Sequence, residues 1–182
     1  MSGKIFLAFS VFFMVFTATE FETIPWRENT KLRWNHFRGK PAKNISAAAV
    51  TASGITFEFS IQETESHVVG FNSKVFAHFY PNQSWYVKEL CNAHILAHEQ
   101  LHFDITELYA RKFRNQISEL KLSNTIRNQL QSLHENINKE LAATQRRYDK
   151  ETDNSKNPKM QSQWAAYVEK ELAKREAYKS KD

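Results

Sequence analysis

The sequence predicts a single α+β domain in which antiparallel strands come first and three helices follow. Two observations support this fold class. From about residue 25 to residue 80, apolar and polar residues alternate between turn residues, a pattern typical of strands. From about residue 84 onward, apolar residues recur at helical spacing instead. Strands followed by helices favour a segregated α+β fold over an alternating parallel sheet.

The length and composition fit one folded domain. A chain of 182 residues can bury one sizeable core but is short for two ordinary domains. A hydrophobic content of 41%, with only 4 Gly and 4 Pro, excludes disordered, low-complexity and collagen-like classes. The single cysteine, Cys91, excludes an intramolecular disulfide and a cysteine-based zinc knuckle. Any metal site must therefore use histidines and carboxylates.

The N-terminus resembles a secretory signal peptide. Lys4 precedes an apolar run from Ile5 to Phe16 that only Ser10 interrupts, and small residues follow it. As a helix this run would be about 18 Å long, which is short of the roughly 30 Å hydrocarbon core of a bilayer. We expect residues 1–19 to be a signal peptide and residues 20–182 to form a secreted or periplasmic domain with no stable membrane span. Because the cleavage site is poorly formed, an uncleaved anchor stays open.

Three segments carry the strand pattern. The first is KLRWNHF, residues 31–37, which RGKP closes with turn chemistry. The second, residues 47–61, offers two short runs around Gly54, and the later run alternates apolar and polar residues. The third, residues 67–80, predicts one or two further strands that end at Pro81.

Three helices are expected after the strands. The first is expected from about Ser84 or Trp85 to Leu120, and Ser123 or Asn124 is a plausible N-cap for the second. The second helix carries apolar residues at near-heptad spacing and is broken before Pro158; these residues are Ile126, Leu130, Leu133, Ile137, Leu141 and Tyr148. The third is expected from about Met160 to Tyr178.

The first predicted helix contains the sequence His-Glu-Gln-Leu-His at residues 98–102. Four-residue spacing separates His98 and His102 by about 40° around a helix and about 6 Å along it, so both imidazoles can reach one ion. Glu99 would then lie beside the ion, where its carboxylate could accept a proton from a metal-bound water. The spacing predicts a zinc site with His98 and His102 as ligands and Glu99 as the catalytic base.

The rest of this helix refines the prediction. His94 also lies on the side of His98, but it is about 12 Å along the axis from His102, so we expect it to support or pack against the site. Asp104, Glu107 and Arg111 fall on the opposite side. Glu107 and Arg111 are therefore expected to form an intrahelical i,i+4 ion pair, and not to ligate the metal.

At these residues the chain resembles a bacterial family of predicted secreted zinc-dependent proteases, long described as a domain of uncharacterised function. The string LAHEQLHFDITELYARK is similar to the central signature of that family, and YDKETDNSKN followed by QSQW is similar to a second signature. Upstream, LRWNHFRGKP, AAAVTASGITFEF and the Ser84-Trp85 pair lie where similar elements are expected in that family. The resemblance covers nearly the whole mature chain and implies a zincin-like peptidase domain that is exported.

One position departs from the family. The second signature usually carries a histidine two residues after the threonine matched by Thr152, and this chain has Asn154 instead. A catalytic zinc normally has three protein ligands and water, and asparagine is a poor zinc ligand. The sequence leaves the third ligand open among these residues: Asp149, Glu151, Asp153, His134, Glu135, His36, His67 and His78.

The function these features favour is a secreted zinc metallopeptidase, a hydrolase in which a zinc-activated water attacks a peptide or protein substrate. Tyr148 and His134 are candidates for an additional electrophile. Two alternatives stay open: a catalytically lapsed exported metal- or peptide-binding module, and a basic helical surface that binds anionic envelope polymers. The net charge is +5, but charges alternate in sign along the helical segments, so nucleic-acid binding is not expected.

Overall fold

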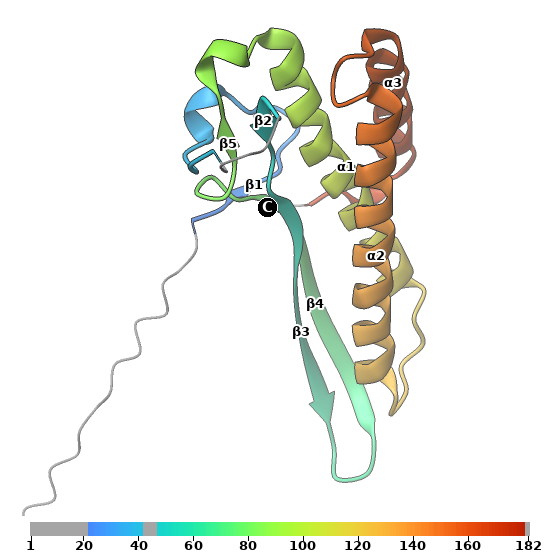
Figure 1. Cartoon of the computed structure of the whole chain (residues 1–182). Helices are drawn as coiled ribbons and strands as arrows, with labels where there is room; N and C mark the ends of the chain where they lie inside the picture. Colours follow the sequence, from blue (N-terminus) through green and yellow to red (C-terminus); the bar gives the residue numbers. More distant parts are fainter. Residues whose placement is uncertain (1–21, 42–46, 181–182) are drawn as a thin grey trace, which may run out of the picture.

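The computed structural model describes residues 22–41 and 47–180, and its fold is α+β, as the sequence predicts. Antiparallel strands precede three helices, of which the first is long (Figure 1). The strands are β1 (Ile24–Pro25), β2 (Ala49–Val50), β3 (Ser53–Glu63), β4 (Val68–Phe79) and β5 (Trp85–Tyr86). The helices are α1 (Ala93–Ser118), α2 (Ile126–Thr152) and α3 (Pro158–Lys174).

A long hairpin dominates the sheet. Strands β3 and β4 pair antiparallel from Ser53 opposite Phe79 to Glu63 opposite Val68, and β1 joins the outer edge of β4 to give the order β1-β4-β3. Strands β2 and β5 form a separate antiparallel pair. The alternation along β3 turns Phe57 toward the helices, where its ring lies 4.8 Å from that of Phe113 on α1.

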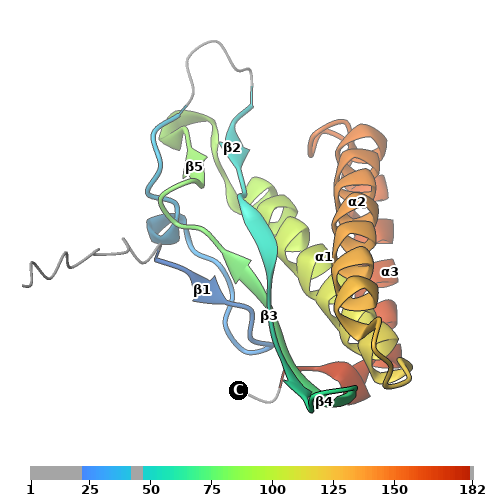
Figure 2. The ribbon, with the colours of Figure 1, turned by 90° about the horizontal axis from the view of Figure 1, so that it is seen from below.

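Helix α1 lies between the strands and the pair of helices α2 and α3, as Figure 2 shows. It is therefore buried on several sides, and it contributes a large share of the core: Leu101, Phe103, Ile105, Leu108, Tyr109, Ala110, Phe113 and Ile117. The side chain of Asn92 caps its start by accepting a hydrogen bond from the backbone N–H of Ile95. A helix enclosed in this way holds the side chains it carries in fixed positions.

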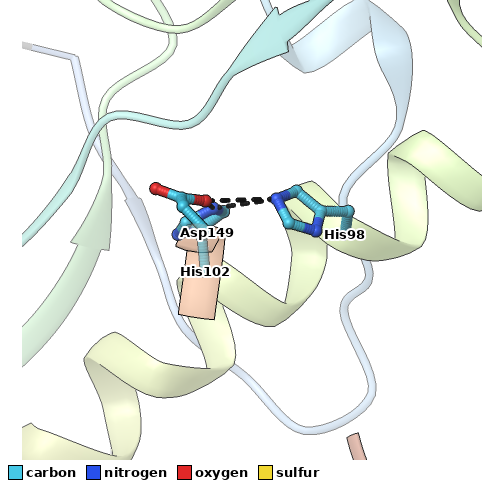
Figure 3. A group of neighbouring side chains, drawn as sticks. All are labelled: His98, His102 and Asp149. Carbon is cyan, nitrogen blue, oxygen red and sulfur yellow. Dashed lines mark hydrogen bonds and ion pairs between the residues drawn. The ribbon is translucent and has the colours of Figure 1, made fainter. Parts of the chain in front are cut away.

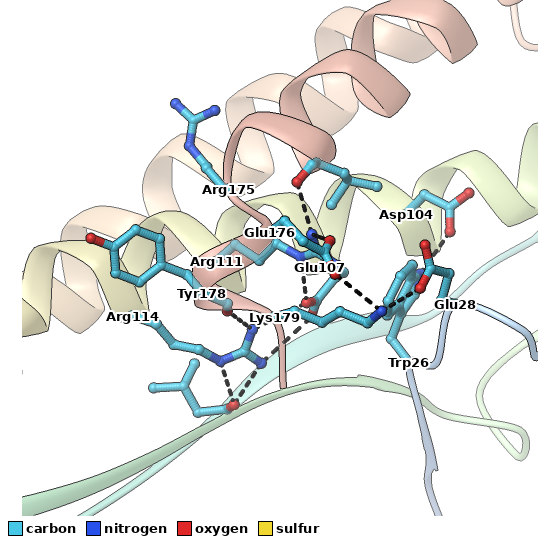
Figure 4. A network of polar contacts seen from close by, with 12 residues as sticks. Trp26, Glu28, Asp104, Glu107, Arg111, Arg114, Arg175, Glu176, Tyr178 and Lys179 are labelled. Carbon is cyan, nitrogen blue, oxygen red and sulfur yellow. Dashed lines mark hydrogen bonds and ion pairs between the residues drawn. The ribbon is translucent and has the colours of Figure 1, made fainter. Parts of the chain in front are cut away.

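Ion pairs and hydrogen bonds join α1 to the C-terminal segment and to β4 (Figure 4). Glu107 and Arg111 form the expected i,i+4 pair at 3.0 Å, and both side chains are almost fully buried. Arg111 also bonds to the carbonyl of Leu172 and to Glu176. Arg114 joins Glu107 to the carbonyl of Val75 on β4. The sequence predicted the pair but not its burial, which arises because the C-terminal segment folds back over it.

Two local predictions about the strands and the first helix were wrong. Residues 31–37 form no strand; Trp34–His36 is a short 3-10 helix, because Leu32 and Phe37 are buried in a loop and not across a sheet. The first helix begins at Ala93 and not near Ser84, because Trp85–Tyr86 pairs with β2.

The N-cap of α2 also differs from expectation. It is Thr125 and not Ser123 or Asn124, and the Asn124 side chain instead accepts a hydrogen bond from Val68 of the hairpin. The third helix ends at Lys174, and a separate 3-10 turn covers Glu176–Tyr178.

The predicted signal peptide, residues 1–19, lies outside the described residues. Within residues 22–41 and 47–180, no helix combines the length and the apolar character needed to cross a membrane.

Candidate metal centre

His98 and His102 lie one turn apart on α1 and turn their rings toward the same point (Figure 3). Their Nε2 atoms are 3.2 Å apart. His98 is buried, with 4% of its surface exposed, and His102 is partly buried. The two residues that the spacing predicted as ligands are therefore brought together.

The third group at this point is Asp149, in the last turn of α2. Its Oδ1 atom lies 2.8 Å from Nε2 of His102 and 3.3 Å from Nε2 of His98. Asp149 follows Tyr148, which is fully buried on the apolar stripe by which α2 packs on α1. The packing of the two helices thus selects Asp149 from the carboxylates and histidines that the sequence left open.

The spacing of the three atoms fits a metal ion. All three lie within 4.8 Å of one another. An ion with tetrahedral bonds of 2.0 to 2.1 Å places neighbouring ligand atoms about 3.3 Å apart, close to the distances between these nitrogens and the oxygen. Two histidines and a carboxylate are also a donor set that zinc accepts in proteins.

Other side chains fix the orientation of both rings. The Gln145 amide donates from Nε2 to the carbonyl of His102 at 2.9 Å, so its Oε1 faces Nδ1 of the same histidine and accepts from it. This tautomer leaves the lone pair of His102 Nε2 free for a metal. His98 is held differently, since its ring stacks on Tyr148 with centroids 4.5 Å apart, and its Nδ1 has no partner among the described residues.

At this site, charges and hydrogen bonds shift the pKa values of His102 and Asp149 in the direction opposite to the effect of burial. Burial disfavours the charged form of His102, but its hydrogen bond to Asp149 and the negative charges of Glu99 and Asp149 raise its pKa. Burial likewise disfavours the ionised form of Asp149, yet hydrogen bonds from His102 and His98 hold the pKa of its carboxyl far below the usual value. Without a metal, the two groups therefore form an ion pair.

Glu99 lies next to this group with a free oxygen. Only 4% of its surface is exposed, and its Oε2 atom is buried without a hydrogen-bond partner among the described residues. Its backbone carbonyl accepts a hydrogen bond from the Thr51 hydroxyl at 3.2 Å, which ties α1 to the chain after β2. A buried carboxylate oxygen without a partner is costly in a structural role and is available for proton transfer.

These groups lie at the wall of a cavity of about 460 Å³. Its lining includes His98, Glu99, His102, Asp149 and Ile95. Residues 47–51, which include β2, contribute a second part of the lining, and residues 154–156 contribute a third. The cavity thus combines a group that could hold a metal ion with a buried, unpaired carboxylate oxygen.

The other residues considered from the sequence lie elsewhere. His94 donates from Nε2 to the Ser155 carbonyl at 2.7 Å, so it supports the turn after α2, in line with the expected supporting role. His134 packs against Phe57 and Phe113 under the hairpin. The Tyr148 hydroxyl points to the carbonyl of His98 at 3.4 Å. Neither His134 nor Tyr148 is among the residues that line the cavity.

Gln145 is the site residue that the sequence analysis missed. It lies one helical turn before Asp149 and on the same side of α2, so a search for polar residues at i−4 from each candidate ligand would have found it.

Residues 81–157 match the family described as "Bacterial protein of unknown function (DUF922)". No curated protein and no solved structure is significantly similar to the chain. The matched segment contains both histidines, Glu99, Gln145 and Asp149. The candidate metal centre therefore lies within the segment that matches this family.

Proposed function

We propose that this chain is an exported zinc-dependent peptidase of zincin type, with His98, His102 and Asp149 as metal ligands and Glu99 as the general base. The observation that carries the proposal is the convergence of two imidazole nitrogens and one carboxylate oxygen beside a buried, unpaired carboxylate oxygen. The proposal of export rests on the apolar run from Ile5 to Phe16.

Each residue of the site has a separate role in the proposed reaction. Glu99 accepts a proton from the attacking water through Oε2 and delivers it to the leaving amine. A bound zinc ion would supply Lewis acidity, which lowers the pKa of water toward about 7 and stabilises negative charge on the substrate carbonyl oxygen. Gln145 keeps His102 in the tautomer that binds a metal, and Tyr148 keeps the ring of His98 in place.

A peptide suits the cavity as a substrate. Five consecutive residues, Ala47–Thr51, line it, and they include the short strand β2. An extended run of chain can present backbone N–H and C=O groups to an extended peptide. The small side chains of Ala47, Ala48 and Ala49 leave space for the side chains of that peptide.

The test compares zinc-loaded protein with its Glu99→Gln variant on a mixed peptide library read by mass spectrometry. Glu99→Gln keeps the size of the side chain but removes the proton acceptor, so zinc content and melting temperature should survive while hydrolysis falls by a factor of order 10² or more. His98→Ala should instead lose zinc and hydrolysis together. Equal hydrolysis by wild type and Glu99→Gln would contradict the mechanism.

A second outcome would identify the alternative function. Wild-type protein that holds zinc and cleaves no peptide would be a catalytically lapsed metal- or peptide-binding module. Export has its own test, since extracytoplasmic protein should begin between about Thr17 and Phe21 in mass analysis.

A further inference from the structure

Three consecutive residues after α2 adopt the left-handed backbone conformation. They are Asp153, Asn154 and Ser155, with φ values of 48°, 50° and 73°. Only glycine adopts this conformation without steric cost, although asparagine and aspartate tolerate it better than other residues. A run of three such residues without glycine is unfavourable and persists only where its surroundings impose it.

The two adjoining helices impose this turn. The backbone N–H of Asn154 donates to the carbonyl of Asp149 at 2.8 Å, and that of Asn157 donates to Thr152 at 2.8 Å, so the turn closes the end of α2. His94 on α1 holds the Ser155 carbonyl at 2.7 Å. Asn157 then caps the start of α3 through the Met160 N–H. The turn is therefore a fixed part of the site.

The turn forms part of the cavity lining and keeps two hydrogen-bond donors without a partner. Asn154, Ser155 and Lys156 all line it, beside the metal-binding group. Among the described residues, the backbone N–H of Ser155 has no acceptor and the Lys156 ammonium has no carboxylate within 4 Å. Apart from the histidines, Lys156 is the cationic side chain among the residues that line this cavity. The free N–H of Ser155, followed directly by the unpaired ammonium of Lys156, suits an anion.

We propose that residues 154–156 form a subsite that binds a carboxylate of the substrate. This proposal rests on the proposed peptidase function of the same cavity. Glu99 and Asp149 make the inner part of the cavity negative, so an anionic group of a peptide is attracted at the turn and not beside the base. The carboxylate has two possible sources, an acidic side chain or the free C-terminus of the peptide.

The experiment measures equilibrium binding, so that it does not depend on turnover. Zinc-loaded Glu99→Gln protein is titrated with fluorescently labelled peptides that form two matched pairs. One pair has blocked ends and differs by Glu against Gln, and the other differs by a free against an amidated C-terminus. Each titration is repeated with Lys156→Glu added. Lys159→Glu is the control, because Lys159 is exposed in the first turn of α3 and is not among the lining residues.

We expect the carboxylate member of one pair to bind at least about fivefold more tightly, and Lys156→Glu to abolish that preference while Lys159→Glu retains it. The pair that discriminates identifies the source of the carboxylate. The proposal is overturned if neither pair discriminates, if no peptide binds, or if Lys156→Glu keeps the preference. If the Glu99→Gln protein prefers the carboxylate peptide but wild-type protein hydrolyses no peptide, the subsite is supported and the peptidase function is refuted.

Discussion

Replacement of Gln145 by leucine should weaken zinc binding although Gln145 is not a proposed ligand. The Gln145 side chain accepts the Nδ1 proton of His102 and donates to the His102 carbonyl at 2.9 Å and to the Thr106 hydroxyl at 3.3 Å. Leucine has similar bulk but none of these bonds. The His102 ring then loses both its fixed orientation and the preference for the tautomer that leaves Nε2 free.

The size of the effect follows from what is lost. Removal of an acceptor behind a metal-bound histidine typically costs 10-fold to 100-fold in metal affinity, or about 1.4 to 2.7 kcal/mol. We therefore expect the Kd for zinc to rise between about 10-fold and 100-fold.

The assay is a competition titration of zinc against a chromophoric chelator at fixed pH. Gln131→Leu is the matched control, because it makes the same change at an exposed position of α2. Its Kd should stay within about twofold of wild type. A Gln145→Leu protein that folds and binds zinc as tightly as the control would refute the argument that this side chain orients His102.

Three further predictions concern stability. Removal of zinc with a chelator should lower the melting temperature, because the ion binds only the folded chain; an unchanged transition in protein with measured zinc would argue against a site on α1. Glu107→Ala should lower the free energy of unfolding by about 3 to 5 kcal/mol in denaturant titrations, since it leaves the buried Arg111 without its main partner, and a loss below 1 kcal/mol would contradict the network. In metal-free protein, the raised pKa of His102 and the lowered pKa of Asp149 predict that their pair stabilises the fold fully from about pH 3.8 to 6.5. This contribution should be lost as the pH rises through the folded pKa of His102 or falls through that of Asp149, and Asp149→Asn should remove this pH dependence.

The sequence predicted what depends on spacing within one element. The four-residue separation of His98 and His102 determines their relative position on any helix, and Glu99 follows with them. The alternation in the later part of residues 47–61 likewise predicted a strand, which the structure shows as β3. Both arguments need only the period of a helix or a strand.

What the sequence left open depends on how elements dock. Asp149, Glu151 and Asp153 were equal candidates for the third ligand, because only the register of α2 against α1 brings Asp149 to the histidines. The burial of Glu107 and Arg111 depends on the return of the C-terminal segment, which no local pattern records. The alternation in residues 31–37 failed for the same reason, since no partner strand lies beside that segment in the described chain.

The zinc content and zinc affinity of purified wild type, Asp149→Asn and Asp153→Asn test the metal centre most directly. Both variants replace a carboxylate by an amide at the end of α2, but only Asp149 faces the histidines. The structure predicts one zinc per chain in wild type and in Asp153→Asn, and a loss of affinity of at least about 100-fold in Asp149→Asn. Wild-type protein that binds no zinc, or an Asp149→Asn protein that binds it as tightly as Asp153→Asn, would contradict the assignment of His98, His102 and Asp149 as a metal site.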